Sequence, residues 1–366
     1  MKILIGICGI GKGHCSRQNI IINELLKRGH EVRILTYNDG VDFFASSNIK
    51  VYKVFVPIIM FKKNKINYLD FIKRNGKKLI PGYITNKKIF NKLKKEKFIP
   101  DVCISDYEPI VARFAYKMNK PLINIDQQSK FIYMNADEIN GFSIFEEKNR
   151  MNLFFPKCNE KLIISFYKIN SKSLPKNVKI LAPIIRDEVK KNNKINKKKK
   201  VVVYFSKFIH IPIKQNMNEI FELFSKFEDY EFKIYISENS QTCRIPYKNI
   251  EIKKNDTITF AKDLGDACCA ISTAGHTLIS EALYCNIPTY VVPLPTFDQN
   301  YCAKFINDNN IGYASEMITY NNLKNFINNI NYYVENINKC ENLLKGEDSM
   351  KCIIREIEKY ENNNKC

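Results

Sequence analysis

The segment that decides the fold is residues 1–17, which read MKILIGICGIGKGHCSR. A run of apolar residues from Ile3 to Cys8 opens the segment, and three glycines and His14 follow within the next six positions. Residues 16–28 then carry apolar side chains at helical spacing. A buried strand, a glycine-rich turn and an amphipathic helix in this order are typical of a doubly wound parallel sheet.

The same rhythm continues through the chain. We expect further strands at residues 32–36, 101–105, 122–125, 201–205, 232–236, 267–272 and 289–292. Helical patterns separate several of these strands, at residues 108–118, 214–227 and 276–285. Two successive β-α-β arrays predict an α/β protein with two Rossmann-like domains that face each other across a cleft.

A lysine-rich run separates the two arrays. Residues 190–200 contain seven lysines in eleven positions, and such like charges repel one another and stay solvated. We therefore expect the interdomain linker there. The predicted organisation is an N-terminal domain over 1–185, a linker over 186–199, a C-terminal domain over 200–335 and a helical tail over 336–366.

The composition agrees with two folded domains and limits the partners. At about 150 residues per domain, 366 residues suggest two domains, and 45% hydrophobic residues exclude a disordered chain. The formal net charge of +20 predicts non-specific attraction to polyanions. The chain carries neither a recognition-helix motif nor an RNA-binding signature, so nucleic acid is not expected as its specific partner.

The cysteines and the hydropathy pattern indicate the compartment. Twelve cysteines are scattered through the chain without a C-x-x-C pair, and most lie in apolar runs where cysteine packs as a small hydrophobe. No run approaches the roughly 20 apolar residues of a transmembrane helix. These features predict a cytoplasmic protein in a reducing compartment.

Residues 53–100 are strongly basic. They contain fourteen lysines and arginines against Asp70 and Glu96, with aromatic and aliphatic residues interleaved. One interpretation is a helical insertion with a core-facing side and a solvated basic side. The other is a surface for the acceptor or for an anionic membrane, because amphipathic basic segments bind such surfaces.

The glycine turn after the first strand allows a ligand to approach the backbone closely. Its spacing is G-x-G-x-G-H, and the strand at 32–36 ends without the acidic residue that holds a ribose in dinucleotide-binding proteins. Gly11 and Gly13 are therefore candidates for contact with a different ligand. His14, at the end of the turn, is a candidate proton acceptor, with a helix-capping histidine as the alternative.

Asp106 is the candidate partner of His14. A histidine that accepts a proton usually needs a carboxylate on its other ring nitrogen. Asp106 follows the carboxyl end of the strand at 101–105, at the same sheet edge as the glycine turn. Asp101 precedes that strand, so we expect it at the opposite edge in a structural role. The alternative for Asp106 is that it only caps the helix that follows.

A second strand, turn and helix in the C-terminal half carries hydroxyl groups. The turn and the start of the helix supply Ser272, Thr273, Gly275, His276 and Thr277. Hydroxyls, a glycine and the free N–H groups of a helix start form a seat for a diphosphate, to which the imidazole can also donate. Glu281 lies further along the helix and is placed to reach sugar hydroxyls. The alternative is a capped, buried helix with Glu281 on its solvated side.

The loop after the strand at 289–292 leads to Asp298 and Gln299. Adjacent carboxylate and amide groups at a helix start suit the recognition of sugar hydroxyls. Asp298 is also a good helix N-cap, which is the structural alternative.

The chain resembles GT-B glycosyltransferases, specifically the glycosyltransferase family 28-like and UDP-glycosyltransferase-like group that includes the peptidoglycan lipid-intermediate N-acetylglucosaminyl transferase. The resemblance covers most of the chain. The residues that carry it are the glycine turn through Arg17, the segment 181–186, the turn 272–276 with Glu281, and Asp298-Gln299. The chain departs from the group in having Asp-Gln where many relatives have Glu-Gln, and in having no tryptophan.

The resemblance implies that the C-terminal domain holds a nucleotide-sugar donor, usually UDP-linked. Gly275 and His276 would meet its diphosphate, Glu281 the ribose, and Asp298-Gln299 the transferred sugar. The family needs no bound metal, because the helix start and hydrogen-bond donors carry the diphosphate charge. We accordingly expect no cofactor, with the UDP-sugar as a co-substrate.

The resemblance also assigns the N-terminal domain to the acceptor. It implies that the glycine turn, with Gly11 and Gly13, faces the acceptor, and that His14 is the base with Asp106 as its partner. It implies further that the C-terminal helix packs back on the N-terminal domain.

The predicted function is an inverting, metal-independent transfer of a sugar from a UDP-linked donor to a hydroxyl of an unidentified acceptor, which is a glycan, a lipid-linked molecule or a small molecule. One alternative is a UDP-sugar 2-epimerase of the same fold, although the chain lacks that enzyme's carboxylates at the glycine turn. Another is a non-catalytic protein that binds sugar nucleotides or polyanions. The expected location is the cytoplasm, with peripheral membrane contact through residues 53–100 if the acceptor is lipid-linked.

Overall fold

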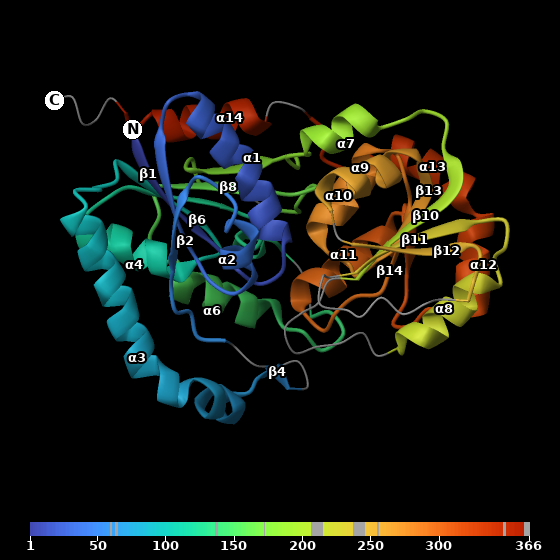
Figure 1. The fold of residues 1–366 in the computed structure, drawn as a ribbon, viewed down its shortest axis with the longest axis horizontal. Coiled ribbons are helices and arrows are strands. Elements are labelled where there is room, and N and C mark those ends of the chain that lie inside the picture. Colours follow the sequence, from blue (N-terminus) through green and yellow to red (C-terminus); the bar gives the residue numbers. More distant parts are fainter. Residues whose placement is uncertain are drawn as a thin grey trace. The chain divides into compact units, whose positions relative to one another are not determined.

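The structure is a computed structural model, and it describes residues 1–58, 61–62, 65–135, 138–171, 173–205, 215–236, 246–254, 256–346 and 349–361. The chain divides into two compact units. The first unit contains Met1–Ile184 and Gly346–Cys366, and the second contains Ile185–Lys345. Each unit is built on its own parallel sheet with helices between the strands (Figure 1).

A seven-stranded parallel sheet forms the centre of the first unit. In spatial order, its strands are β3 (Lys50–Lys53), β2 (Glu31–Thr36), β1 (Lys2–Ile7), β6 (Val102–Asp106), β7 (Leu122–Asp126), β8 (Glu160–Ile164) and β9 (Val178–Leu181). The chain order reverses at β1, which pairs with β2 on one side and β6 on the other. In doubly wound sheets, ligands bind beyond the carboxyl ends of the strands at this reversal point.

Helices cover both faces of this sheet. They are α1 (Gly13–Lys27), α2 (Asp39–Phe43), α3 (Tyr68–Lys95), α4 (Pro109–Met118), α5 (Lys130–Tyr133), α6 (Ile144–Phe154) and α14 (Ser349–Glu358). Apolar side chains of α1 and α14, such as Ile22 and Ile354, pack on one face of the sheet. The other face packs against α4, α6 and the end of α3, through Phe114, Met151 and Leu93. A parallel sheet needs such cover on both faces because its strands are apolar on both sides.

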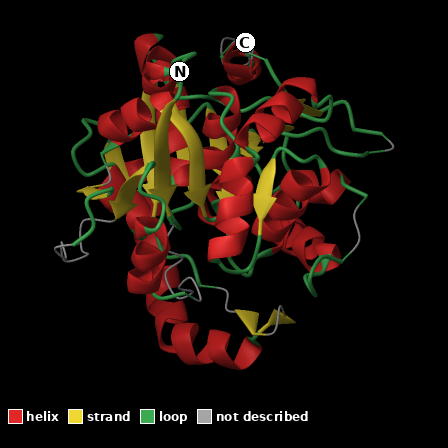
Figure 2. Cartoon of the chain, turned by 90° about the vertical axis from the view of Figure 1, so that its right-hand side faces the viewer, coloured by secondary structure: helices red, strands yellow, loops and turns green. Residues whose placement is uncertain are grey.

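The long helix α3 is held against the extended segment that follows β3. The carboxamide of buried Asn86 pairs with the N–H and C=O of Phe55, at 2.8 and 2.9 Å. Asn75 does the same for Ile58, at 3.0 and 2.9 Å. Gly82 lies between the two asparagines, and a Cβ at this position would come within 2.1 Å of the Phe55 ring. Figure 2 shows the rest of α3 extending away from the sheet of the first unit, beside the small hairpin of β4 (Phe61–Lys62) and β5 (Lys65–Ile66).

A six-stranded parallel sheet forms the second unit. In spatial order, its strands are β12 (Ile250–Lys254), β11 (Glu231–Ile236), β10 (Lys198–Tyr204), β13 (Ala267–Ser272), β14 (Thr289–Val291) and β15 (Gly312–Ala314). Its helices are α7 (Asp187–Asn192), α8 (Met217–Ser225), α9 (Thr257–Asp266), α10 (His276–Tyr284), α11 (Phe297–Asp308), α12 (Tyr320–Asn328) and α13 (Ile330–Lys339). The chain order reverses between β10 and β13, as it does between β1 and β6 in the first unit.

The prediction of two Rossmann-like α/β domains is confirmed. The strand predicted at 267–272 coincides with β13, and the predicted helix at 276–285 coincides with α10 to within one residue. These elements have the clearest patterns in the sequence, because the strands are buried on both faces and the turns between them contain glycine and small polar residues.

The predicted linker over 186–199 is wrong as an irregular segment, although most of its lysines are exposed as expected, namely Lys190, Lys191, Lys194, Lys198 and Lys199. Residues 187–192 form α7, whose Val189 is fully buried in the core of the second unit, and β10 begins at Lys198. Lys200 is 7% exposed, and its Nζ donates to Asp263 at 2.9 Å and to Asp266 at 2.6 Å. The carboxylates at the end of α9 thus neutralise part of the lysine run, which the local sequence does not reveal.

The predicted boundary at residue 335 is also wrong, because it falls inside α13 and the second unit continues to Lys345. The packing of the C-terminal helix on the N-terminal domain is confirmed. In α14, Ile353 and Ile357 lie in the core of the first unit. The fully buried carboxylate of Glu356 pairs with Lys179 of β9 at 2.6 Å.

Two glycines of α3 give opposite predictions for stability. We expect Gly82→Ala to lower the unfolding temperature, at a cost of about 1–3 kcal/mol, because the new methyl group would overlap the Phe55 ring. Gly76→Ala is the matched control, since the nearest atom to its Cβ is 3.7 Å away. Replacing glycine in an open helical position stabilises by up to about 1 kcal/mol. Thermal unfolding monitored by circular dichroism tests the pair, and equal effects of the two substitutions would contradict the packing described for α3.

Candidate active site

The first candidate site lies where the strand order of the first unit reverses. β1 leads through the glycine turn into α1, and β6 ends beside it at Asp106. Gly9 packs so closely that a Cβ would lie 1.5 Å from the carbonyl oxygen of Tyr37. Gly11 has a φ of +72°, and its N–H donates to the carboxylate of Asp39 at 3.0 Å. The backbone of the turn is therefore fixed by glycine geometry and by Asp39, a residue that the sequence analysis did not single out.

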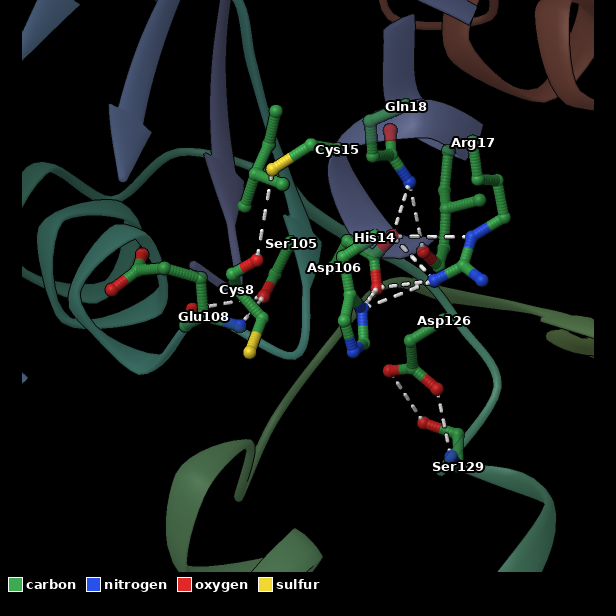
Figure 3. A network of polar contacts seen from close by, with 12 residues as sticks. Cys8, His14, Cys15, Arg17, Gln18, Ser105, Asp106, Glu108, Asp126 and Ser129 are labelled. Atoms are coloured by element: carbon green, nitrogen blue, oxygen red, sulfur yellow. Dashed lines mark hydrogen bonds and ion pairs between the residues drawn. The ribbon is translucent and has the colours of Figure 1, made fainter. Parts of the chain in front are cut away.

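The structure brings His14 and Asp106 together. His14 is the second residue of α1, and its Nδ1 lies 2.7 Å from Oδ1 of Asp106 (Figure 3). Because an ionised carboxylate only accepts hydrogen bonds, Nδ1 carries the hydrogen and Nε2 presents its lone pair. The side chain of His14 is 15% exposed, whereas that of Asp106 is fully buried. This arrangement suits a histidine that accepts a proton from a ligand at Nε2.

Two further residues of α1 bind the same carboxylate, and the sequence analysis missed both. The Arg17 guanidinium reaches both oxygens of Asp106, with NH2 at 2.7 Å from Oδ1 and 2.6 Å from Oδ2. Gln18 donates from Nε2 to Oδ2 at 2.9 Å. Positions 14, 17 and 18 follow the i, i+3, i+4 spacing of one helix face, which is the signal that could have identified them.

Asp106 and Glu108 are both buried, yet the structure shifts their pKa values in opposite directions. Burial by itself would raise the pKa of Asp106, but the charge of Arg17 and the contact with His14 outweigh it and lower that pKa. Burial raises the pKa of Glu108 to about 8, against two hydrogen bonds from the backbone. The first carboxyl group is therefore held as an anion, whereas the second is neutral near pH 7.

Glu108 is the N-cap of α4, and the alternative that Asp106 caps this helix is wrong. The carboxyl group of Glu108 accepts from the N–H groups of Ile110 and Val111, at 2.8 and 2.7 Å. Tyr107, between the two acidic residues, has a left-handed backbone with a φ of +53°. Figure 3 shows Glu108 pointing away from the cluster around Asp106. The expected structural role of Asp101 is confirmed by its hydrogen bond of 2.8 Å from the Lys2 N–H.

The second candidate site is the turn between β13 and α10, at the reversal point of the second sheet. Ser272 is fully buried, and its Oγ has no hydrogen-bond partner within the described part of the chain. Gly275 is the N-cap of α10, and its side-chain direction is open, with no atom closer than 4.0 Å to an ideal Cβ. The unpartnered hydroxyl of Ser272 and the open space at Gly275, three residues further along, are each compatible with a phosphate ligand at this helix start.

The remaining residues of this turn lie close to the helix start. Thr273 and His276 are buried, and Thr277 is half-buried in the first turn of α10. Ser280 donates to the carbonyl oxygen of His276 at 2.7 Å, and its Oγ lies 3.3 Å from Nδ1 of the same residue. The sequence-predicted diphosphate residues are thus neighbours on one turn, although their contact with a donor stays a prediction.

Glu281 lies on the buried side of α10 and has an ionic partner. Its Oε1 and Oε2 accept from Nε and NH2 of Arg186, both at 2.6 Å. Glu281 is 2% exposed, so the alternative of a solvated side chain is wrong. Burial would lower the pKa of Arg186, but the hydrogen bonds to Glu281 outweigh it and raise that pKa. The predicted ribose contact of Glu281 stays a prediction, and Arg186 is the residue that orients its carboxylate.

Asp298 and Gln299 begin α11. The N-cap of this helix is Thr296, so the alternative that Asp298 caps it is wrong. Asp298 is half-buried in the first turn. Gln299 is 8% exposed, and its Oε1 accepts from the N–H of Leu294 at 2.8 Å. Gln299 therefore holds the loop before α11 in place, which leaves its amide nitrogen for the predicted sugar contact.

The described part of the chain contains neither a metal cluster nor a disulfide. Its residues include no group of three or more His, Cys, Asp or Glu side chains arranged to hold a metal ion. Its ten cysteines are all free. No helix within the described ranges is both long enough and apolar enough to cross a membrane.

The family is established by comparison with known proteins. The model of the glycosyl transferase family 1 matches residues 1–331, and the chain belongs to this family. A relative from Rickettsia massiliae, the UDP-N-acetylglucosamine–N-acetylmuramyl-(pentapeptide) pyrophosphoryl-undecaprenol N-acetylglucosamine transferase, is 24% identical over 357 residues, which cover 86% of this chain and 87% of the relative. The chain is therefore a glycosyltransferase.

Solved structures show the same fold. The calicheamicin glycosyltransferase CalG4 matches with a TM-score of 0.65 at 13% identity, covering 98% of both chains. MurG of Acinetobacter baumannii matches with a TM-score of 0.59 at 14% identity, covering 98% of this chain and 99% of the other. The two parallel sheets with interleaved helices form the GT-B fold, and the resemblance found in the sequence is confirmed.

The raised pKa of Glu108 generates a prediction on stability. The folded chain holds the Glu108 proton up to about pH 8, whereas the unfolded chain releases it near pH 4.5, so this group destabilises the fold increasingly as pH rises between these values. We expect the melting temperature of Glu108→Gln to fall less than that of the parent protein as pH rises from 5 to 9, by roughly 10 °C, because the amide has no proton to lose. The amide accepts only one of the two backbone N–H groups, and this loss of stability is the same at every pH. Melting curves from pH 5 to 9 test this.

The matched control is Glu222→Gln, at an exposed position. Its melting temperature is expected to follow that of the parent protein at every pH. A constant difference between Glu108→Gln and the parent protein across the pH range would contradict a buried, protonated carboxyl group at position 108.

Proposed function

We propose that this glycosyltransferase inverts the configuration at the anomeric carbon of the transferred sugar. In this proposal it uses a UDP-linked donor without a metal ion, and His14 is its base. The observation that carries this proposal is the 2.7 Å contact between Nδ1 of His14 and the fully buried carboxylate of Asp106. The contact fixes the tautomer and leaves Nε2 free to take a proton. A histidine held in this way is suited to general base catalysis.

The proposed sugar transfer uses residues of both units. The oxygen of the acceptor hydroxyl attacks the anomeric carbon, and its proton passes to Nε2 of His14. The bond between the anomeric carbon and the diphosphate oxygen breaks, and the diphosphate leaves with the electron pair. A single displacement of this kind inverts the configuration. The negative charge on the leaving group grows in the transition state, where N–H groups of a helix start stabilise it most.

The start of α10 is the proposed donor seat. The unpartnered Oγ of Ser272 and the open space at Gly275 support it, since both features suit a phosphate group. Neighbouring Thr273, His276 and Thr277 complete the seat, with Glu281 for the ribose and Asp298 and Gln299 for the sugar. Such donors of hydrogen bonds make a metal ion unnecessary for holding the diphosphate. The name of the Rickettsia massiliae relative contains a UDP-linked sugar, which supports the choice of nucleotide.

Membership of a glycosyltransferase family favours transfer over the two alternatives, a 2-epimerase and a non-catalytic binding protein. Glu108, the carboxyl group two residues after Asp106, is neutral near pH 7 and points away from the site. Glu108 therefore does not act as a second base beside His14 in this proposal.

We also propose that α3 places the enzyme on an anionic membrane surface at the cytoplasmic face. One stripe of this helix is apolar and exposed, with Leu69, Ile72, Ile80 and Tyr83 each exposed by 62–74%. Exposed basic residues lie beside the stripe, namely Lys73, Arg74, Lys77, Lys78, Lys87 and Lys88. A helix with an apolar stripe and basic flanks binds at the surface of anionic bilayers. The undecaprenol-linked acceptor in the name of the relative supports a lipid-linked acceptor.

The donor and base roles are tested together. In a panel of UDP-, dTDP- and GDP-sugars, we expect a UDP-sugar to raise the melting temperature most, because a ligand stabilises by RT ln(1 + [L]/Kd). His14→Ala is expected to keep this shift but to lose transfer by about 10²–10⁴-fold. Gly275→Val is expected to keep the parent's own melting temperature, since its Cβ direction is open, and to lose the shift. Transfer that survives His14→Ala would overturn the role of the base, and a shift that survives Gly275→Val would overturn the donor seat.

Membrane docking is tested with vesicles. We expect Ile80→Glu combined with Tyr83→Glu to reduce sedimentation with phosphatidylglycerol vesicles by at least about tenfold, because two exposed apolar side chains are lost and two negative charges are added. Ile195→Glu is the matched control, at a position 98% exposed outside α3. Equal binding of the double variant and the control, or equal binding of the parent protein to neutral phosphatidylcholine vesicles, would contradict the proposal.

A further inference from the structure

We propose that Arg17 is a positioning residue that keeps His14 unprotonated near neutral pH, so that the histidine is ready to act as a base. This inference rests on the proposed role of His14 in transfer. Arg17 does not touch the reacting atoms. It acts through Asp106, the carboxylate that it shares with His14.

The side chains of Arg17, Asp106 and His14 are in contact with one another. NH2 of Arg17 lies 2.7 Å from the same Oδ1 that binds His14, and 3.2 Å from Nδ1 of His14 itself. Nε of Arg17 donates to Oδ2 at 3.2 Å. The Arg17 side chain is 4% exposed and that of Asp106 is fully buried, so water screens these charges weakly.

The charges decide which form of His14 this cluster favours. A histidine paired with a lone buried carboxylate readily becomes an imidazolium, because the resulting ion pair is neutral. Here the guanidinium already neutralises Asp106, and protonation of His14 would place a second cation beside the first. Arg17 therefore opposes protonation of His14, and neutral imidazole is the form that accepts a proton from an acceptor hydroxyl.

Asp106 does not accept a proton from His14. Its oxygens already accept from Arg17 and from Nε2 of Gln18, which is anchored in turn by the carbonyl oxygen of Ile125 at 3.1 Å. Arg17 also holds the pKa of Asp106 low, against the effect of burial. The carboxylate thus orients Nδ1–H and stays ionised, and proton transfer is confined to Nε2.

Other charged or titratable groups surround this cluster from neighbouring elements. They are Tyr107, whose ring stacks near that of His14 with centroids 6.3 Å apart, Asp126 at the end of β7, Arg150 of α6, and Asp39, which binds the glycine turn. Burial raises the pKa values of the nearby Cys8, Cys15 and Glu108, so these groups are uncharged near pH 7. Asp126 is hydrogen-bonded to Ser129, and burial raises its pKa to about 6 (Figure 3). Asp126 and Asp39 have hydrogen-bond partners of their own, but the charge of Asp126 also interacts with the charges of Asp106 and Arg17. Among the residues that the structure describes, Arg17 is the cation in contact with the His14–Asp106 pair.

The test compares neutral and charged replacements of Arg17. In Arg17→Gln and Arg17→Met, we expect the acidic limb of the kcat/KM profile to move about 1–3 pH units upward, with activity recovering at alkaline pH. Arg17→Lys keeps the charge, so its limb stays near that of the parent protein while kcat falls because the bidentate contact is lost. A loss of activity that is uniform over pH in the folded neutral variants would show a merely structural role and overturn the proposal.

A second readout does not depend on transfer. The titration midpoint of the His14 ring, followed by NMR and assigned with His14→Gln, is expected to rise in Arg17→Gln and Arg17→Met but not in Arg17→Lys. Melting curves identify which variants are folded, and the two neutral replacements guard against the failure of one. An unchanged midpoint in a folded neutral variant would overturn the role of Arg17. If transfer survives His14→Ala while the midpoint still moves, the proposed base is wrong and the electrostatic effect of Arg17 stands.

Discussion

In a parallel sheet every strand ends at the same edge, and both candidate sites of this protein depend on that constraint. In the first unit, the carboxyl ends of β1 and β6 are neighbours at the point where the strand order reverses, which brings the glycine turn, His14 and Asp106 together. In the second unit, β13 ends next to β10 at the equivalent point, and the turn before α10 follows it. Loops at this edge can vary without disturbing the apolar sheet beneath them.

Buried charge gives the first site its chemical character. Asp106 is surrounded by donors from one face of α1, so it is an anion although it is fully buried. Glu108, two residues along the chain, lacks a cationic partner and takes the neutral form near pH 7. Two carboxyl groups of similar burial therefore differ in charge because of their neighbours alone. The same principle explains the second unit, where Arg186 binds both oxygens of the buried Glu281.

Sequence patterns predict the structure correctly where neighbouring residues determine it. They fail where contacts with residues far along the chain determine it. The strand, turn and helix at 267–285 was predictable because apolar runs and small turn residues fix the backbone locally. The lysine run at 190–200 predicts a linker, but residues 187–192 form α7, and Asp263 and Asp266 neutralise Lys200 from positions more than sixty residues away. The role of Arg17 is not visible in the local sequence, because its partner Asp106 lies 89 residues further along the chain.

The sequence by itself determined the α/β class, the two arrays of strands, the glycine turn and the residues His14 and Asp106 as a candidate pair, because periodicity and turn chemistry are properties of neighbouring residues. Only the tertiary structure decided that Arg17 and Gln18 share the Asp106 carboxylate, that Glu108 caps α4, and that α14 completes the core of the first unit. These outcomes depend on which helix face meets which strand end, and that is fixed by packing between residues far apart in the chain.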